Sequence, residues 1–302
     1  MTSSDRTLVV GATGQLGMQI VDRLKSVGCP VRAMLRETAD AFCRDWVLGR
    51  SNDVVPGDLK DPTTLGAACR GVRTVISTAS STLSRQPGDT IPSVDEDGQL
   101  ALVEAAEREH VEHFVFVSFL PIEADFALQR AKRRVEERLR SSRMSHTILQ
   151  PVNFSEVWLS PLLGFDPAHG SARVLGDGTR PVSWVSIVDV ARFAVAARAG
   201  GAWANRVLPI GGPDPLSPLQ VLAIYRELGV RDVRVTHVPE ADLEAQLENA
   251  PDPVQEAFAG IMLGTARGQV VDPRPMLQLL PGRLSTVREH ATRTVQNAQN
   301  EP

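Results

Sequence analysis

The chain has 302 residues, of which 42% are hydrophobic and 23% charged, and its net charge is -4. This composition is typical of a globular protein large enough to bury a sizeable core. Because basic residues do not outnumber acidic ones, the composition argues against nucleic acid or an anionic membrane as a partner. No apolar run reaches the roughly 18 residues that span a bilayer, and residues 1–6 are polar, so we expect a cytoplasmic protein.

Strand and helix patterns alternate over the first half of the chain. Short apolar and β-branched runs predict six strands, at residues 7–10, 31–35, 53–55, 74–77, 114–117 and 147–149. Helical spacing of apolar residues predicts helices at 15–27, 61–68, 94–109 and 124–141. Strict alternation of this kind indicates an α/β fold with a doubly wound parallel sheet of the Rossmann type, with helices on both faces.

The pattern loosens in the second half of the chain. We expect a core at 1–152, a small C-terminal cap at 153–285 and a frayed tail at 286–302, where the sequence turns polar. Within the cap we predict a loop-rich start, strands and helices that return to the core, and a final helical stretch broken by prolines. These segments are 153–181, the strands 182–185 and 207–210, the helices 187–199 and 216–228, and the stretch 240–281.

A glycine-rich turn, GATGQLG, joins the first predicted strand to the first predicted helix. Gly11 permits the tight turn, Gly14 lets the backbone approach a pyrophosphate, and Gly17 allows close packing of helix on strand. The helix start offers N–H groups and a positive dipole to phosphates. The turn therefore predicts a dinucleotide site, with an empty tight turn as the alternative. Its residues are Gly11, Thr13, Gly14, Gln15, Leu16 and Gly17.

The end of the second predicted strand distinguishes two dinucleotides. An acidic residue there binds the ribose 2′-hydroxyl of NAD, whereas an arginine accommodates the 2′-phosphate of NADP. Arg36 stands at this end and Glu37 follows it, while Arg32 lies at the wrong end of the strand. We therefore expect NADP(H) rather than NAD(H), the alternative being that Arg36 is a solvated surface residue.

Several longer motifs, together with the glycine turn, give the chain a family resemblance over about residues 7–228. It resembles the atypical short-chain dehydrogenase/reductases of the NmrA-like group. The motifs are GATGQLG at 11–17, VRAMLR at 31–36, GDLKDPTTL at 57–65, VDEDGQLALVEAAEREHVEHFVFVS at 94–118, AKRRVEERLRSSRMSHTILQP at 131–151, VSIVDVARFAVAA at 185–197 and IGGPDPLS at 210–217.

The resemblance implies further residues along the cofactor. Asp58 and Leu59 should flank the adenine, and Thr78 and Ala79 should lie beside the dinucleotide. Residues that follow the later strands should complete the site, because ligands of such folds bind outside the carboxyl ends of the strands. These are Ser118, Pro151, Asn153 and Phe154.

The proton relay that the resemblance implies is incomplete. Enzymes of this group that reduce carbonyls use a serine and a Tyr-x-x-x-Lys arrangement, in which tyrosine is the general acid. Lys132 matches the lysine, but Leu128 occupies the tyrosine position, and Phe119 occupies the serine position beside Ser118. The one tyrosine of the chain, Tyr225, is far away in the sequence.

Lys132 is the predicted catalytic residue. The chain has three lysines, and this one shares a helical apolar stripe with Leu128, Val135 and Leu139. A buried ammonium needs a partner, and the ribose hydroxyls of the cofactor are the natural candidate. The alternative is a surface lysine that extends its charge to solvent. Trp158 and Trp184 are candidates for substrate contact, although for Trp184 core packing is favoured.

Three functions fit these residues. The first is an NADP(H)-dependent oxidoreductase that reduces a small aromatic, enone or quinone-like substrate without the Ser/Tyr relay. The second is a regulator or assembly factor that senses NADP(H) without turnover, and the third is a non-redox isomerase or cyclase. The cysteine and histidine spacings predict reduced thiols and no metal site, and the sequence allows a homodimer.

Overall fold

Seven strands form the main sheet, in the order β3-β2-β1-β4-β5-β6-β9. Each neighbouring pair from β3 to β6 is parallel. The predicted doubly wound α/β sheet is therefore confirmed, and its strand order reverses between β1 and β4, where such folds bind ligands. The strands are β1 (Thr7–Val10), β2 (Val31–Leu35), β3 (Asp53–Pro56), β4 (Thr74–Ser77), β5 (His113–Val117), β6 (Ser145–Pro151) and β9 (Arg206–Ile210).

The computed structural model describes residues 5–51, 53–84 and 86–300. It divides into two units by its internal contacts. The first contains Met1–Phe119, Ala127–Gln150 and Val190–Leu208, and the second contains Leu120–Phe126, Pro151–Asp189 and Pro209–Pro302. The short segment 120–126 thus belongs with the C-terminal unit, and residues 190–208 return to the first.

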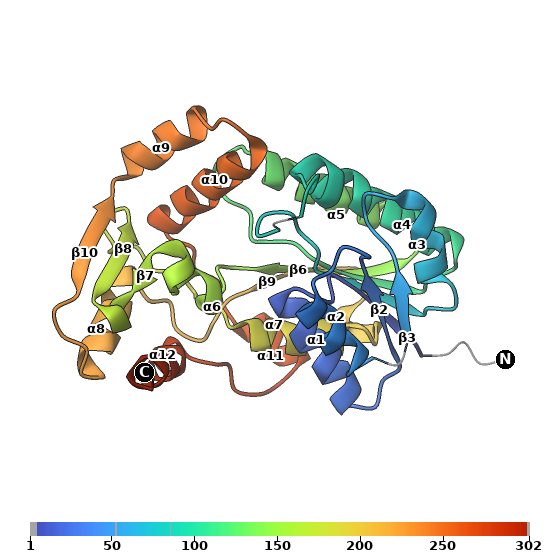
Figure 1. Cartoon of the computed structure of the whole chain (residues 1–302), viewed down its shortest axis with the longest axis horizontal. Coiled ribbons are helices and arrows are strands. Elements are labelled where there is room, and N and C mark those ends of the chain that lie inside the picture. Colours follow the sequence, from blue (N-terminus) through green and yellow to red (C-terminus); the bar gives the residue numbers. More distant parts are fainter. Residues whose placement is uncertain (1–4, 52, 85, 301–302) are drawn as a thin grey trace. The chain divides into compact units, whose positions relative to one another are not determined.

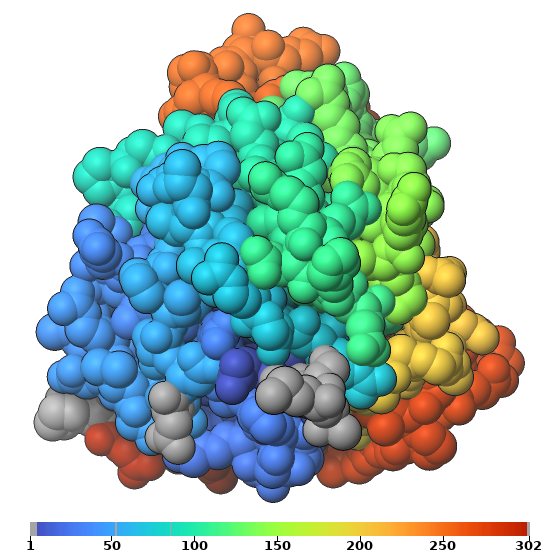
Figure 2. Space-filling model, turned by 90° about the vertical axis from the view of Figure 1, so that its right-hand side faces the viewer, coloured from blue at the N-terminus to red at the C-terminus, as the bar shows by residue number. Residues whose placement is uncertain are grey.

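Helices cover both faces of the sheet in the first unit (Figure 1). One face carries α1 (Gln15–Ser26), α2 (Ala41–Leu48) and α7 (Ile187–Ala197). The other carries α3 (Pro62–Cys69), α4 (Gly98–Arg108) and α5 (Ala127–Arg140), whose buried residues form one apolar cluster with the strands. In Figure 2 the blue-green and green residues of this second layer form a continuous surface above the blue N-terminal residues.

The predicted helix 94–109 has a different start in the structure. Residues Ile91–Asp97 form a π-helix, η1, and α4 follows from Gly98. Thr90 and Ser93 cap η1 reciprocally. Single-turn π-helical segments are uncommon and concentrate at functional sites. Here the π-helix brings Asp95 into the interior, where its side chain has no exposed surface.

The second unit is built on a three-stranded sheet in the order β10-β8-β7. Its strands are β7 (Phe165–Asp166), β8 (Ser171–Leu175) and β10 (Arg234–Val238). Its helices are α6 (Ser155–Trp158), α8 (Pro218–Glu227), α9 (Glu240–Glu248), α10 (Pro253–Arg267), α11 (Arg274–Leu279) and α12 (Val287–Gln299), and 3-10 turns at Pro161–Leu163 and Pro167–His169 lie on either side of β7. The predicted strand 182–185 forms isolated bridges instead, between Val182 and both Leu216 and Gln269, and between Val185 and Phe154.

The expectation of a frayed tail at 286–302 is wrong for the described residues. Thr286 and Glu289 form a capping box that starts α12. Although the segment is polar on average, Val287, Ala291 and Val295 lie on one face and pack into the apolar cluster of the second unit. Burying one apolar stripe is enough to hold a polar helix in place.

Candidate functional site

The glycine turn forms a tight cradle between β1 and α1. Gly11 has φ = +85°, and a Cβ on Gly17 would lie 2.0 Å from the Gly11 carbonyl oxygen. Both positions therefore require glycine, as the sequence predicts. A Cβ on Gly14 would meet nothing closer than the Gly11 oxygen at 3.4 Å. Gly14 is thus free of internal crowding, which fits a role in leaving room for a ligand. Thr78 closes the cradle by donating its N–H to the Val10 carbonyl at 2.9 Å.

The start of α1 keeps its N–H groups available. Among the described residues no side chain caps Gly14, and the first turn of α1 contains no acidic residue. Asp40, Ser217 and Thr286 cap α2, α8 and α12, whereas α6, α9 and α11 also start without a side-chain cap. An uncapped helix start with a glycine cradle suits an anionic ligand. These residues fit the pyrophosphate of a dinucleotide.

Charged groups gather at the carboxyl end of β2. Arg36 Nη1 lies 2.6 Å from Asp89 Oδ2, and Lys60 Nζ lies 2.7 Å from Asp89 Oδ1. Lys60 is also 3.9 Å from Asp58, and Ser84 donates its hydroxyl to Asp89. The sequence predicted Arg36 and Asp58 here, but neither Lys60 nor Asp89. Arg36 is not simply a solvated arginine, because the chain supplies it with a carboxylate.

The pKa of Asp89 reflects this arrangement. Burial acts to raise it, but hydrogen bonds from Lys60, Ser84 and Arg36 outweigh burial and hold the pKa below its usual value. The Asp89 side chain is only 3% exposed, whereas that of Arg36 is 29% exposed. The carboxylate is therefore enclosed, and its arginine partner remains accessible to solvent.

Lys132 is buried, as its place on the apolar stripe of α5 predicts. Only 4% of it is exposed, and its Nζ lies 3.1 Å from Asp95 Oδ1 and 5.1 Å from the centre of the Phe116 ring. Asp95 Oδ2 accepts hydrogen bonds from the Ser81 N–H at 2.9 Å and hydroxyl at 2.6 Å. The surface alternative for Lys132 is wrong. Its ammonium is paired within the chain, and the expected contact with a ribose stays a prediction.

The position of the usual tyrosine offers no proton. Leu128 is 3% exposed on the same helix face as Lys132. Tyr225 is fully buried in the second unit, where its ring meets that of Phe165 edge to face at 6.1 Å. Burial also raises the pKa of Tyr225. The one tyrosine of the chain is thus a core residue.

Ser118 belongs to a second buried network. Its hydroxyl donates to Glu136 Oε1 at 2.7 Å, and the Gln150 amide donates to the same oxygen at 2.9 Å. Arg133 and Arg140 lie 2.6 and 3.0 Å from the two Glu136 oxygens. Burial lowers the pKa of Arg133 although Glu136 opposes the change. The Ser118 proton is therefore held by a carboxylate, and the expected contact of Ser118 with the cofactor stays a prediction.

The predicted residues after β6 lie in the second unit. Pro151 ends β6 and accepts the Leu120 N–H at 3.1 Å, while Asn153 donates to the Thr265 hydroxyl at 2.6 Å. Phe154 is the N-cap residue of α6. Trp184 is 3% exposed and donates its ring N–H to the Leu216 carbonyl, so it is a core residue, as favoured.

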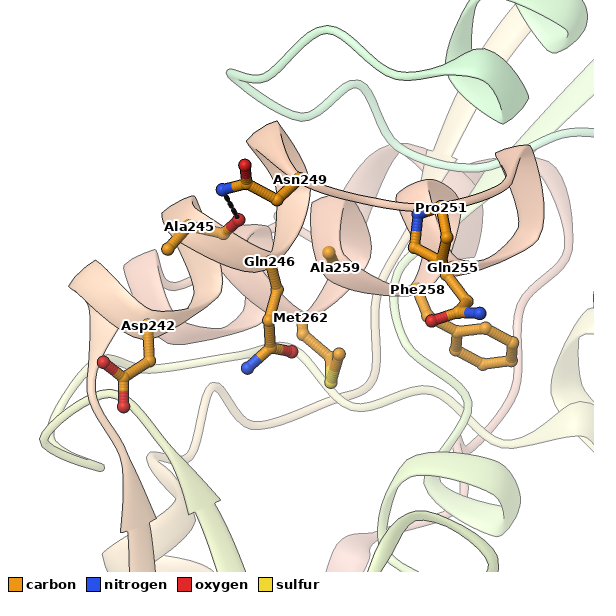
Figure 3. Close-up of a pocket in the computed structure, with 9 residues that line it drawn as sticks. All are labelled: Asp242, Ala245, Gln246, Asn249, Pro251, Gln255, Phe258, Ala259 and Met262. Carbon is orange, nitrogen blue, oxygen red and sulfur yellow. Dashed lines mark hydrogen bonds between the residues drawn. The ribbon is translucent and has the colours of Figure 1, made fainter.

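A groove of about 590 Å³ runs between α9 and α10. Figure 3 shows Gln246 of α9 and Met262 of α10 extending on the same side of the two helices, with Phe258 further along. Its lining includes none of the residues predicted to bind the cofactor. Asn249 turns inward on its own helix and donates to the Ala245 carbonyl at 2.8 Å.

Comparison with known proteins identifies the family. A family model described as NAD(P)H-binding matches residues 11–199, the segment that contains the glycine turn, Arg36 and Lys132. The chain belongs to this NAD(P)H-binding family. The NAD(P)-binding family that the motifs predict is thereby confirmed.

Relatives of this NAD(P)H-binding protein have different roles. The photosystem II assembly factor Ycf39 of Cyanophora paradoxa is 30% identical over 78% of this chain and 73% of its own. A (4-alkanoyl-5-oxo-2,5-dihydrofuran-3-yl)methyl phosphate reductase of Streptomyces griseus is 31% identical over 91% and 93%. An NADPH-dependent quinone oxidoreductase of Escherichia coli, solved with NADPH, has a TM-score of 0.75 at 19% identity and covers 95% of this chain and 99% of its own. This last likeness concerns the fold.

Two further properties concern the described residues only. They contain no group of three or more His, Cys, Asp or Glu side chains arranged to hold a metal ion. Within the same residues, every helix is too short or too polar to cross a membrane.

Sequence reasoning missed Asp89, Lys60, Asp95 and Glu136. Lys60, Asp95 and Glu136 lie within the longer motifs, but nothing in those motifs marks them as partners of other charged groups, and Asp89 lies outside the motifs. Three of the four lie in irregular or π-helical segments. Burial of Lys132 implied that it has a partner of opposite charge. In a regular α-helix over 94–109, however, nothing in the sequence would place Asp95 in the interior. The π-helix at Ile91–Asp97 is what places Asp95 in the interior.

Proposed function

We propose that this protein is an NAD(P)H-dependent reductase of a small aromatic, enone or quinone-like molecule, with NADPH as the preferred cofactor. The observation that carries the proposal is the buried ion pair between Lys132 of α5 and Asp95 of η1. The same unit contains the glycine cradle at residues 11–17, which fits a pyrophosphate. Family membership and a reductase relative aligned over nine-tenths of both chains support it.

Different residues of the chain bind and position the parts of the cofactor. The cradle and the uncapped α1 bind the phosphates, and Arg36 binds the 2′-phosphate. Lys132 positions the nicotinamide ribose, while Asp95 fixes the lysine side chain. When bound, the dinucleotide supplies a hydride. Because Leu128 replaces the usual tyrosine, the matching proton comes from water or from the substrate.

A second function has one specific observation in its favour. An NADP(H)-binding regulator or assembly factor needs a cofactor site but no proton donor, and Leu128 removes the donor. The similarity to Ycf39 supports this alternative. The two functions differ in hydride transfer, which can be measured directly.

The test measures transfer of deuterium from 4-deuterated NADPH to a panel of quinones and enones, beside NADPH affinity without substrate. We expect stereospecific transfer to at least one class. Tight NADPH binding without transfer to any member of the panel would contradict the reductase and favour the regulator.

Gly14→Val is the matched negative control. A valine there fills the space of the pyrophosphate, yet its Cβ would meet only the Gly11 oxygen, at 3.4 Å, within the protein. We therefore expect a folded variant, with an unchanged circular dichroism spectrum, that binds no dinucleotide. Normal NADPH binding by this variant would show that the glycine turn is not the site.

A further inference from the structure

The adenosine end of the site contains an anion of its own. We propose that Asp89 occupies the position between Arg36 and Lys60 that the 2′-phosphate of NADPH takes, and that it thereby limits the preference for NADPH over NADH. This inference rests on the dinucleotide site of the proposed function and deepens it, because it names Lys60 as a second phosphate ligand and Asp89 as their internal competitor.

The geometry of Asp89 is that of a bound anion. Each carboxylate oxygen faces a different cation, Arg36 at 2.6 Å and Lys60 at 2.7 Å, and the Ser84 hydroxyl donates to it as well. The cations come from separate places in the fold, the end of β2 and the turn between β3 and α3. Two converging cations with a hydroxyl donor form the kind of cluster that recognises a phosphate.

The burial of Asp89 separates this cluster from an ordinary surface ion pair. Its side chain is 3% exposed, while Arg36 and Lys60 remain 29% and 26% exposed. The carboxylate is therefore enclosed by the chain, and the cations are reachable from outside. Lys60 is further oriented by donating to the Pro87 carbonyl at 3.0 Å. Asp58, at 3.9 Å, is the other carboxylate near this lysine.

The consequence for binding is asymmetric. The 2′-phosphate of NADPH must take Arg36 and Lys60 away from Asp89, so the measured affinity is reduced by the fraction of molecules in which the cations are available. NADH has no 2′-phosphate and leaves the three side chains in place. Removing the charge of Asp89 should therefore strengthen NADPH binding and leave NADH binding nearly unchanged.

The experiment compares Asp89→Asn with the wild type by calorimetry. The ligands are NADPH, NADH, and adenosine 2′,5′-bisphosphate against adenosine 5′-monophosphate, which differ in the 2′-phosphate alone. We expect the dissociation constants of NADPH and of the bisphosphate to fall by about ten-fold, with those of NADH and the monophosphate within about two-fold. An unchanged or lower ratio of NADPH to NADH affinity would overturn the proposal.

Asp53→Asn is the matched control. Asp53 is also held by two cations, Arg6 and Arg32, each at 3.0 Å, but at the start of β3. The variant makes the same charge change, and we expect the same affinities as the wild type. If Asp53→Asn strengthens NADPH binding as much as Asp89→Asn does, the effect is one of net charge and the proposal fails.

Lys60→Gln gives a second test that does not depend on the fold of the Asp89 variant. We expect weaker binding of NADPH and of the bisphosphate, by about three-fold to ten-fold, and unchanged binding of NADH. Equal losses for both dinucleotides would contradict the role of Lys60. Failure of the reductase is distinguishable, because it appears as absent deuterium transfer with these affinity changes intact.

Discussion

Charged groups lie at both the amino ends and the carboxyl ends of the strands of the main sheet, here called its amino edge and its carboxyl edge, but they are bound differently at the two edges. At the amino edge Asp53 lies between Arg6 and Arg32, and His113 lies between Ser145 and Thr147 at 2.7 and 3.0 Å. Every one of these contacts joins strand starts or their neighbours. At the carboxyl edge an uncapped helix, the Arg36–Lys60–Asp89 cluster and the Lys132–Asp95 pair follow the strand ends.

The two edges differ in whether a charged side chain could exchange its present partner for a ligand. Arg32 also donates to the carbonyls of Ala68 and Arg70, at 3.1 and 2.7 Å, so it is committed to the structure. Arg36 holds one carboxylate and stays 29% exposed. Charged groups at the amino edge therefore stabilise the sheet, and those at the carboxyl edge can serve a ligand.

Lys132→Met should produce the largest loss at the carboxyl edge. It leaves the fully buried Asp95 without its cation, and breaking a buried ion pair typically costs about 3–5 kcal/mol of unfolding free energy. The proposed role of Lys132 in positioning the cofactor predicts that NADPH affinity and turnover fall together. Denaturant unfolding, calorimetry and the deuterium-transfer assay measure the three quantities.

Lys25→Met is the control, since Lys25 is exposed on α1 and donates to the Gly49 carbonyl. It should leave stability, affinity and turnover nearly unchanged. A collapse of turnover in Lys132→Met at unchanged cofactor affinity would contradict a positioning role and indicate a general acid.

His113 should make the amino edge sensitive to acid. Burial, with help from the nearby His146 and Arg73, lowers the pKa of His113 from 6.5 to about 4. The folded pKa lies below the unfolded one, so its stabilising effect is complete above pH 6.5 and is lost as the pH falls toward 4. This lowering of the pKa corresponds to roughly 3 kcal/mol of unfolding free energy.

His113→Gln should flatten this dependence, measured as denaturant midpoints between pH 7 and pH 4, while His237→Gln at an exposed position should not. Burial also lowers the pKa of His146, so part of the slope should remain. If His113→Gln keeps the full acid sensitivity, the network around His113 does not control it.

The sequence predicted the first unit better than the second for a physical reason. Residues that must be glycine, such as Gly11 and Gly17, and strands buried on both faces leave strong local signals. The apolar stripe of α5 also predicted the burial of Lys132. By contrast, β10 is largely exposed and α2 buries only Val47, so neither has a clear apolar period.

The remaining misses concern long-range contacts. The partners of Arg36 and Lys132 lie 53 and 37 residues away in the chain, and one of them depends on a π-helix. In the second unit, α10 packs through Gly260 and Gly264 on Phe126 and Ile122, which come from an earlier segment of the sequence. Periodicity describes a face but does not identify what covers it.

Arg36→Ala and Arg32→Ala should separate the two ends of one strand. Arg36→Ala removes the proposed ligand of the 2′-phosphate, and we expect the preference for NADPH over NADH to fall by about ten-fold, or about 1.4 kcal/mol. Arg32→Ala should lower stability, because Asp53 and two carbonyls lose a donor, without changing the preference. Equal NADPH and NADH affinities in the wild type would contradict the role of Arg36.

The smallest effect should come from salt, which distinguishes exposed charges from enclosed ones. Raising the ionic strength from 0.1 to 1 M shortens the screening length from about 10 to 3 Å. Arg36 and Lys60 are partly exposed, so we expect the ratio of NADPH to NADH affinity to fall by about two-fold to three-fold. The Lys132–Asp95 pair is enclosed, so the stability lost in Lys132→Met should be nearly the same at both salt concentrations. In Arg36→Ala the salt dependence of the ratio should shrink, because one of the two screened cations is gone. A ratio that is independent of salt in the wild type would mean that the 2′-phosphate does not bind at this exposed cluster, and the contrast between the edges of the sheet would then rest on the buried pair alone.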